Sequence, residues 1–140
     1  MGRLDRELLG EKTAVIERHL YRVAERLPAD PHQFAPMTDA SDAVILHLWQ
    51  AVQAVIDLAA SACIHFRLGT PPDYGGSFRR LADAGYLDSN LAARLTQAAG
   101  FRNVVAHAYE QLDMGRVYRA AQEGPADLRA FLKALAERIQ

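Results

Sequence analysis

Apolar residues recur along most of the chain at intervals of three and four, the spacing that places them on one face of an α-helix. No stretch shows the sustained alternation of apolar and polar residues that is typical of a half-buried strand. We therefore predict an all-α protein. The first helix is expected to end before Pro28. Its apolar face is formed by Leu9, Ile16, Leu20, Val23 and Leu27.

A long second helix is predicted after a connection at residues 29–37, which contains two prolines. Thr38, Asp39 and Ser41 are candidate caps, because short polar side chains accept hydrogen bonds from the unpaired N–H groups of a first turn. Gly69 and the two prolines that follow it end this helix. Its apolar positions are Val44, Ile45, Leu48, Val52, Val55, Ile56, Ala59 and Cys63.

Residues 69–77 form the most loop-like stretch of the chain, and a short helix is expected from residue 78 to about residue 84. Asp88 or Ser89 then caps a third long helix. The residues of this helix that are expected to face inward are Leu91, Leu95, Ala98 and Phe101.

A further helix is predicted at residues 114–123, and Gly124 with Pro125 is expected to interrupt it before a last helix begins. Short connections between amphipathic helices are typical of antiparallel neighbours. The pattern therefore predicts one domain over residues 1–140, an antiparallel bundle of about five helices. The apolar positions of the last helix are Leu128, Phe131, Leu132, Leu135 and Ile139.

The charge of the chain is balanced, with 16 basic and 17 acidic residues and a formal net charge of −1. Nucleic-acid binding usually draws on a basic excess, so an RNA-related role would need a local patch. Five arginines could form such a patch, although arginines scattered over helix surfaces are the commoner outcome. They are Arg79, Arg80, Arg94, Arg116 and Arg119.

The remaining composition indicates no metal site or cofactor. Cys63 is the single cysteine, which excludes an intramolecular disulfide, and its alanine-rich surroundings indicate a buried side chain. Four histidines have no metal-ligand spacing with one another or with Cys63 and are interpreted as structural or surface residues. No apolar leader follows Met1 and no run approaches the roughly 18 residues of a membrane span, so we expect a cytoplasmic protein. The four histidines are His19, His32, His47 and His65.

Arg102, Asn103, His107 and Tyr109 cluster where the third long helix is expected to end. These residue types suit RNA cleavage without a metal. A histidine titrates near neutral pH, so it can take a proton from a ribose 2′-hydroxyl or give one to the leaving 5′-oxygen. An arginine can bind the scissile phosphate and the charge of its transition state, and an asparagine can orient either partner.

Helical geometry complicates this site. Asn103 and His107 lie on nearly the same face, whereas Arg102 and His107 point about 140° apart. Three arrangements remain open: the helix ends near His107, the arginine wraps across, or two protomers complete the site together. The third arrangement predicts a symmetric homodimer with the motif at its interface.

Each of these residues also has a simpler interpretation. An arginine and a histidine five positions apart on a helix are often only surface chemistry. Trp49 fits a core or a dimer interface. Asp57 lies in an apolar stretch of the second helix, so it either supports the site by pairing with Arg102 across the bundle or faces solvent.

The segment from Gly100 to Tyr109 resembles the RX4HXY signature of HepT-like proteins, a branch of the HEPN superfamily. The resemblance covers roughly residues 38–140 and is close only at the motif. It implies a five-helix, dimeric, metal-independent endoribonuclease that acts as a toxin. Arg102 and His107 would then be catalytic, with Asn103 as their polar support.

The same resemblance implies a partner, an MNT-type nucleotidyltransferase antitoxin that attaches AMP to the tyrosine matched by Tyr109. A phosphodiester there would add negative charge and bulk beside Arg102 and compete with the RNA phosphate. Alternatively, Tyr109 is a core tyrosine whose hydroxyl has one partner.

The leading hypothesis is thus a homodimeric ribonuclease toxin that needs no metal and leaves 2′,3′-cyclic phosphate ends on its RNA substrate. One alternative is a non-catalytic HEPN module that binds a nucleotide or a nucleotidyltransferase partner. Another is a purely structural helical adaptor. Arginines that converge on the motif would favour cleavage, and an acidic surface around it would favour an alternative.

Overall fold

The computed structural model describes residues 4–73 and 75–139, and in this part of the chain all regular structure is helical. The prediction of an all-α bundle of about five helices is confirmed. The α-helices are α1 (Arg6–Arg26), α2 (Asp39–His65), α3 (Gly76–Asp83), α4 (Ser89–Ala108) and α5 (Met114–Arg138). Short 3₁₀ segments at Pro31–Gln33 and Tyr109–Gln111 lie in two of the connections.

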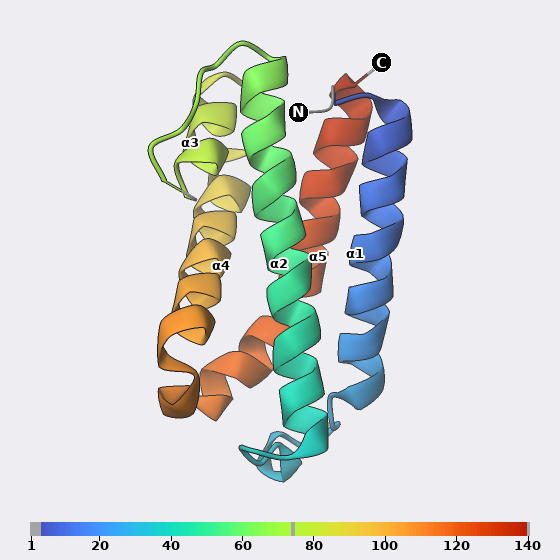
Figure 1. Cartoon of the computed structure of the whole chain (residues 1–140), viewed down its shortest axis with the longest axis vertical. Helices are drawn as coiled ribbons and strands as arrows, with labels where there is room; N and C mark the ends of the chain where they lie inside the picture. Colours follow the sequence, from blue (N-terminus) through green and yellow to red (C-terminus); the bar gives the residue numbers. More distant parts are fainter. Residues whose placement is uncertain (1–3, 74, 140) are drawn as a thin grey trace.

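Helix α2 runs through the middle of the molecule and contacts each of the other four α-helices. Figure 1 shows it between α1 and α4, with α5 behind and the short α3 beside its end. The long helices alternate in direction along the chain, as short connections between amphipathic helices require. This arrangement makes α2 the element against which the motif helix α4 is set.

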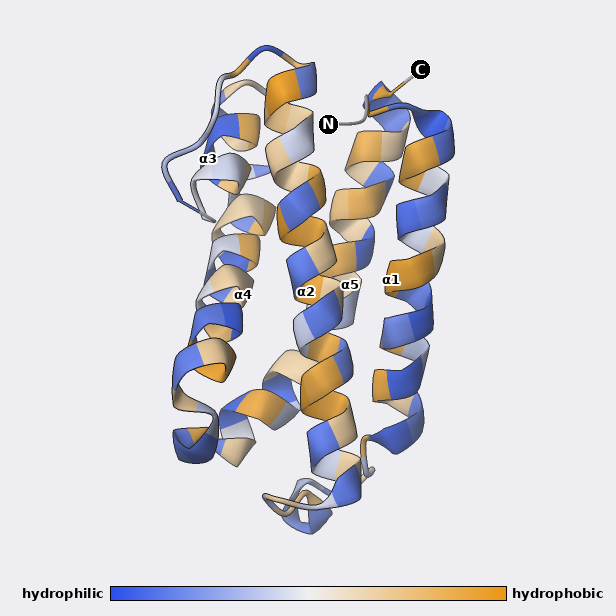
Figure 2. Cartoon of the chain, in the orientation of Figure 1, coloured by the Kyte–Doolittle hydropathy of each residue, from blue (hydrophilic) through white to orange (hydrophobic). Residues whose placement is uncertain are grey.

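The apolar residues of α2 account for its central position. All eight apolar positions predicted for this helix are buried. Figure 2 shows apolar residues along most of α2, whereas polar residues dominate the visible face of α1. Among the described helices, only α2 is long and apolar enough to cross a membrane, but half of its most apolar window is buried inside the bundle. Its composition is therefore explained by its place in the core.

The predicted caps of α2 and α4 are observed. Thr38 and Ser41 form a capping box at the start of α2, in which each side chain accepts from the other residue's backbone N–H at 3.1 Å. Asp88 caps α4 by accepting from the N–H of Leu91 at 3.0 Å. These caps fix where both site-bearing helices begin.

The prediction that Gly124 and Pro125 separate two helices is wrong. Helix α5 is continuous from Met114 to Arg138 with Pro125 inside it, although Figure 1 shows that its first half runs at an angle to the second. Proline lacks an N–H donor and crowds the preceding turn, which bends a helix without necessarily ending it. Buried residues on both sides, such as Val117 and Phe131, hold the two halves against the core.

Two of the histidines meet across the bundle, which their sequence spacing did not indicate. Nδ1 of His19 on α1 lies 3.0 Å from Nδ1 of His47 on α2. Burial lowers the pKa of His19, and His47 and Arg18 lower it further. A neutral His19 ring can form this hydrogen bond as donor or as acceptor, according to its tautomer.

Candidate active site

The motif occupies the last turns of α4 and the turn that follows. The backbone leaves helical geometry at Ala108, with φ −143° and ψ 41°, and Tyr109 opens the next 3₁₀ segment. The side chains of Arg102, Asn103 and His107 therefore all project from regular α-helix. The helix ends one residue after His107, too late to turn His107 toward Arg102, so the two side chains stay about 140° apart around α4.

The Arg102 side chain is held by contacts from α2 and α4. Its Nε donates to Oε1 of Gln53 at 2.6 Å, and its Nη1 donates to Oδ1 of Asn103 at 3.2 Å. The guanidinium carbon lies 5.6 Å from the ring centroid of Trp49, within the range of a cation–π interaction. These contacts restrict the rotation of a side chain that is otherwise among the most flexible.

Trp49 and Asp57 extend this network along α2. The indole Nε1 of Trp49 donates to the backbone carbonyl of Arg102 at 3.2 Å. The amide Nε2 of Gln53 donates to Oδ1 of Asp57 at 3.0 Å. Asp57 is exposed and connects to Arg102 through Gln53. The half-buried Trp49 packs against the motif helix.

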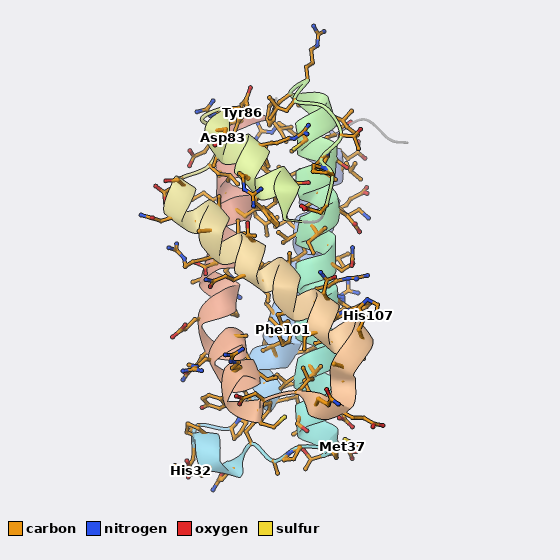
Figure 3. The ribbon with its side chains drawn as sticks, turned by 90° about the vertical axis from the view of Figure 1, so that its left-hand side faces the viewer. His32, Met37, Asp83, Tyr86, Phe101 and His107 are labelled. Carbon is orange, nitrogen blue, oxygen red and sulfur yellow. The ribbon has the colours of Figure 1, made fainter. Side chains whose placement is uncertain are left out.

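His107 and Asn103 are both exposed on α4. Figure 3 shows His107 at the outer edge of this helix, away from Phe101. Phe101 is half buried and lines a small cavity with Leu48 and Leu128 in the middle of the bundle. The same helix thus anchors its inner face in the core and presents an imidazole to solvent, where a large substrate can reach it.

Tyr109 is half buried against the core, and its hydroxyl donates a hydrogen bond to Oδ1 of Asp42 in the first turn of α2. Burial and this carboxylate together raise the pKa of Tyr109 to about 12. The phenol is therefore firmly protonated at neutral pH. This contact joins the end of α4 to the beginning of α2.

Asp42 and Gln53 contact candidate site residues, and the sequence interpretation missed both. A signal existed: Asp42, Trp49, Gln53 and Asp57 are separated by seven, four and four positions. Those separations place them along one side of a mostly apolar helix. Three polar residues on one stripe of such a helix indicate a functional or interface face.

The five candidate arginines do not gather into one patch. Arg80 donates to the backbone carbonyl of Leu68 at 2.9 Å, and Arg94 pairs with Asp127 at 2.9 Å. Arg116 lies nearer the motif, because it lines a hollow of about 710 Å³ together with Phe101 and Val104.

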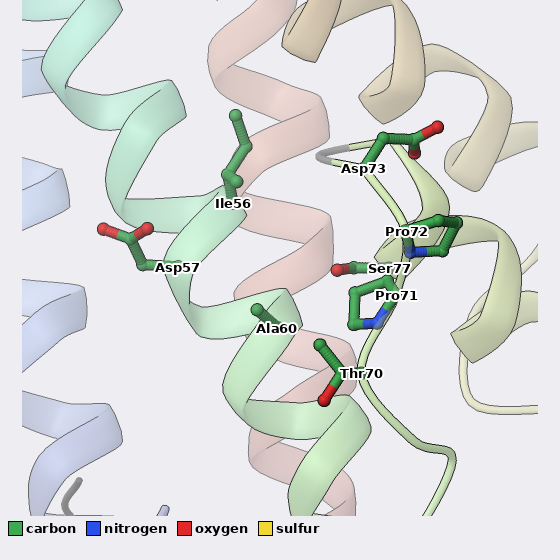
Figure 4. A pocket seen from close by; sticks show the side chains of 8 residues that line it. All are labelled: Ile56, Asp57, Ala60, Thr70, Pro71, Pro72, Asp73 and Ser77. Carbon is green, nitrogen blue, oxygen red and sulfur yellow. The ribbon is translucent and has the colours of Figure 1, made fainter.

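A groove of about 480 Å³ runs between α2 and the loop that precedes α3. Figure 4 shows Pro71 and Pro72 facing α2 across this groove, while the carboxylate of Asp57 is directed away from them. Thr70 and Ser77 add hydroxyl groups to a largely apolar lining. The groove thus lies one to two turns along α2 from Gln53.

Comparison with known proteins gives consistent matches over nearly the whole chain. A family profile described as ribonuclease HepT-like matches residues 16–135. The mRNA nuclease HepT of Shewanella oneidensis is 28% identical over 129 residues, which are 92% of this chain and 96% of that protein.

Solved structures share the same bundle. A tri-AMPylated Shewanella oneidensis HEPN toxin in complex with an MNT antitoxin has a TM-score of 0.86 at 27% identity and covers 95% of this chain and 99% of that one. A toxin–antitoxin structure with AMP-PNP gives 0.87 at 26% identity, covering 95% and 100%. The cytosolic protein YutE of Bacillus subtilis shares the fold, with a TM-score of 0.80 at 17% identity and coverage of 98% and 92%.

Proposed function

The chain belongs to the ribonuclease HepT-like family, and on this premise we propose that it is the toxin of a toxin–antitoxin pair and acts as an endoribonuclease. The observation that carries the proposal is the Arg102 guanidinium, fixed by Gln53, Asn103 and Trp49 on the helix that exposes His107. The similarity to an mRNA nuclease over 96% of its length supports the same activity.

In the proposed mechanism, Arg102 binds the scissile phosphate and stabilises the negative charge that grows on it. His107 takes the proton of the ribose 2′-hydroxyl as the 2′-oxygen attacks phosphorus. The bond to the 5′-oxygen breaks, and that oxygen takes a proton from water as it leaves. The product ends are a 2′,3′-cyclic phosphate and a 5′-hydroxyl. This sequence of steps needs no metal, and Asn103 keeps the guanidinium in place.

We propose that two copies of the chain assemble this site. Within one chain Arg102 and His107 diverge by about 140° around α4, which is awkward for one phosphate. A two-fold axis beside α4 would bring His107 of a second copy toward Arg102. The proposed cleft is therefore lined by Arg102, Asn103 and His107 of both protomers in a cytoplasmic homodimer.

The proposed partner is an MNT-type nucleotidyltransferase antitoxin that attaches AMP to Tyr109. The similar toxin solved with an MNT antitoxin is itself tri-AMPylated. A phosphodiester on Tyr109 would place negative charge and bulk at the end of the motif helix, in competition with the RNA phosphate for Arg102.

The decisive experiment is cleavage of RNA by purified protein in excess EDTA, with analysis of the product ends. We expect cleavage with 2′,3′-cyclic phosphate ends. His107→Ala and Arg102→Ala should each lower the rate by about 10²-fold or more, since each removes a group that acts in the transition state. His32→Ala is the matched control, because its ring is 95% exposed and lies far along the chain from the motif.

Circular dichroism should show that all three variants keep the helical fold. Strict dependence on a divalent metal would contradict the mechanism. Undiminished cleavage by both motif variants would exclude this site.

One observation favours a second candidate, a non-catalytic HEPN module that binds a nucleotide or a nucleotidyltransferase. Arg80 and Arg94 make contacts elsewhere, so they add no positive charge to the motif. This candidate predicts stable binding to the nucleotidyltransferase and no cleavage of any RNA, a result that the EDTA experiment would reveal directly.

A further inference from the structure

The Tyr109 hydroxyl and the Asp42 carboxylate form a hydrogen-bonded pair between segments 67 positions apart. Tyr109 opens the 3₁₀ segment after α4, and Asp42 lies in the first turn of α2. The capping box of Thr38 and Ser41 holds that turn. Asp42 is exposed, so the pair lies where another molecule can reach it.

A phenol is a poor nucleophile until it loses its proton. With the pKa of Tyr109 at about 12, only about one molecule in 10⁵ carries a phenolate at pH 7. Attack on a phosphoryl group therefore needs a base that removes the proton as the new bond forms. A carboxylate hydrogen-bonded to the attacking hydroxyl plays this part in protein kinases.

We propose that Asp42 is the catalytic base for nucleotidyl transfer to Tyr109, so that the acceptor chain supplies this group itself. The inference rests on the modification proposed above. In the step, Oη of Tyr109 attacks the α-phosphorus of a nucleoside triphosphate, and an Oη–P bond forms. The bond from that phosphorus to pyrophosphate breaks, pyrophosphate leaves, and the proton of Oη passes to the Asp42 carboxylate.

The other tyrosines show why this carboxylate also selects the site. Tyr21 is 64% exposed and therefore more accessible than the half-buried Tyr109. Tyr118 donates to the backbone carbonyls of Pro28 and Ala29, which cannot act as bases. Among the tyrosines that the structure describes, Tyr109 alone donates a hydrogen bond to a carboxylate. Exposure would direct transfer to Tyr21, whereas the base directs it to Tyr109.

The test measures the initial rate of adenylate addition by the antitoxin with Mg-ATP, using intact mass and peptide mapping. Asp42→Asn keeps an oxygen that accepts from the phenol but cannot take its proton. We expect the rate on Tyr109 to fall about 10²-fold or more. The remaining rate should rise about tenfold per pH unit toward the pKa of Tyr109, because free phenolate becomes the nucleophile, while the unmutated chain shows a flatter profile.

Two further variants separate a base from a structural contact. Asp39→Asn removes an exposed carboxylate from the same first turn of α2 and should leave the rate unchanged. Asp42→Glu retains a carboxylate and should restore most of the rate that the amide loses. Thermal unfolding followed by circular dichroism reports whether each variant is folded. If Asp42→Asn does not fold, the rate measured for Asp42→Glu decides whether the carboxylate acts as the base.

The outcomes are distinguishable. Equal rates and equal pH profiles for Asp42→Asn and the unmutated chain would overturn the role of Asp42 while leaving the proposed modification intact. Adenylate on Tyr21 in the unmutated chain, or none at all, would overturn the modification of Tyr109 and this inference together.

Discussion

At the scale of single residues, Gln53 decides how Arg102 is presented. Its carbonyl oxygen accepts from the Arg102 Nε and its amide nitrogen donates to Asp57. Because each end of the amide has a partner of the matching kind, the amide has one favoured orientation. The guanidinium is then oriented before any substrate binds, which is what electrostatic stabilisation of a transition state requires.

Gln53→Ala is accordingly expected to lower kcat for RNA cleavage about tenfold and to change KM little, since it loosens the orientation of Arg102 without removing its charge. Steady-state kinetics on a defined oligonucleotide measure both constants. Gln50→Ala, a truncation of the same side chain one turn away on α2, is the control. A kcat for Gln53→Ala equal to that of the control would show that Gln53 does not position Arg102.

The residues of the site differ in how readily the sequence identifies them. Arg102, Asn103, His107 and Tyr109 stand in one short segment, so their chemistry is visible in the sequence itself. Asp42 contacts Tyr109 across 67 positions, and that pairing depends on the rotation of α2 relative to α4. Side-chain packing between helices sets this rotation, and single-helix periodicity carries no information about it.

At the scale of helices, the C-terminal ends of α2 and α3 use the same motif with different residues. After α2, the N–H of Leu68 donates to the carbonyl of Cys63, and the N–H of Arg67 donates to that of Ile64. After α3, Tyr86 and Gly85 donate in the same way to the carbonyls of Leu81 and Ala82. Both are Schellman ends, which need a left-handed residue. Gly85 has φ 87° and Arg67 has φ 62°. Only glycine adopts this conformation without a steric cost.

Arg67→Gly should therefore stabilise the protein by about 0.5–1 kcal/mol. Glycine removes the steric cost of the left-handed conformation, and this gain exceeds the stability lost because glycine is more flexible in the unfolded chain. Gly85→Ala should destabilise it by about 1 kcal/mol for the converse reason. A Cβ on Gly85 meets no atom within 4 Å, so the backbone alone sets that cost. Urea unfolding measures both changes, and a loss of stability in Arg67→Gly would contradict this account.

The capped helix beginnings were predicted better than the course of α5. Thr38 and Asp88 were identified because a cap is a local interaction within four residues. The interruption at Pro125 was wrong because local preference competes with burial. The missing hydrogen bond costs less than leaving the apolar residues on either side unpacked.

At the scale of the molecule, α2 forms the core of the bundle and also holds the candidate site residues of α4 in place. One side of it is buried against the other helices, and another side carries Trp49, Gln53 and Asp57 beneath the motif helix. The fold class follows from periodicity, which reports burial directly. Periodicity does not show whether one chain or two complete the site, because a solvent-facing stripe and a contact between copies give the same pattern.

Mixing two inactive variants tests whether two chains share one site. If Arg102 of one protomer works with His107 of the other, a mixed dimer of Arg102→Ala and His107→Ala chains contains one intact site. Random mixing makes half of the dimers mixed, so activity should recover to about one quarter of the unmutated level. The two variants are unfolded and refolded together, and the RNA-cleavage activity of the mixture is then measured in EDTA.

Each variant refolded alone is the control and should stay inactive. A site within one chain would leave every mixed dimer without an intact Arg102–His107 pair, because each chain lacks one of the two groups. No recovery, despite mixed dimers detected by native mass spectrometry, would therefore place both residues in a single protomer. Arg102 or His107 would then have to move from its present direction on α4 when RNA binds.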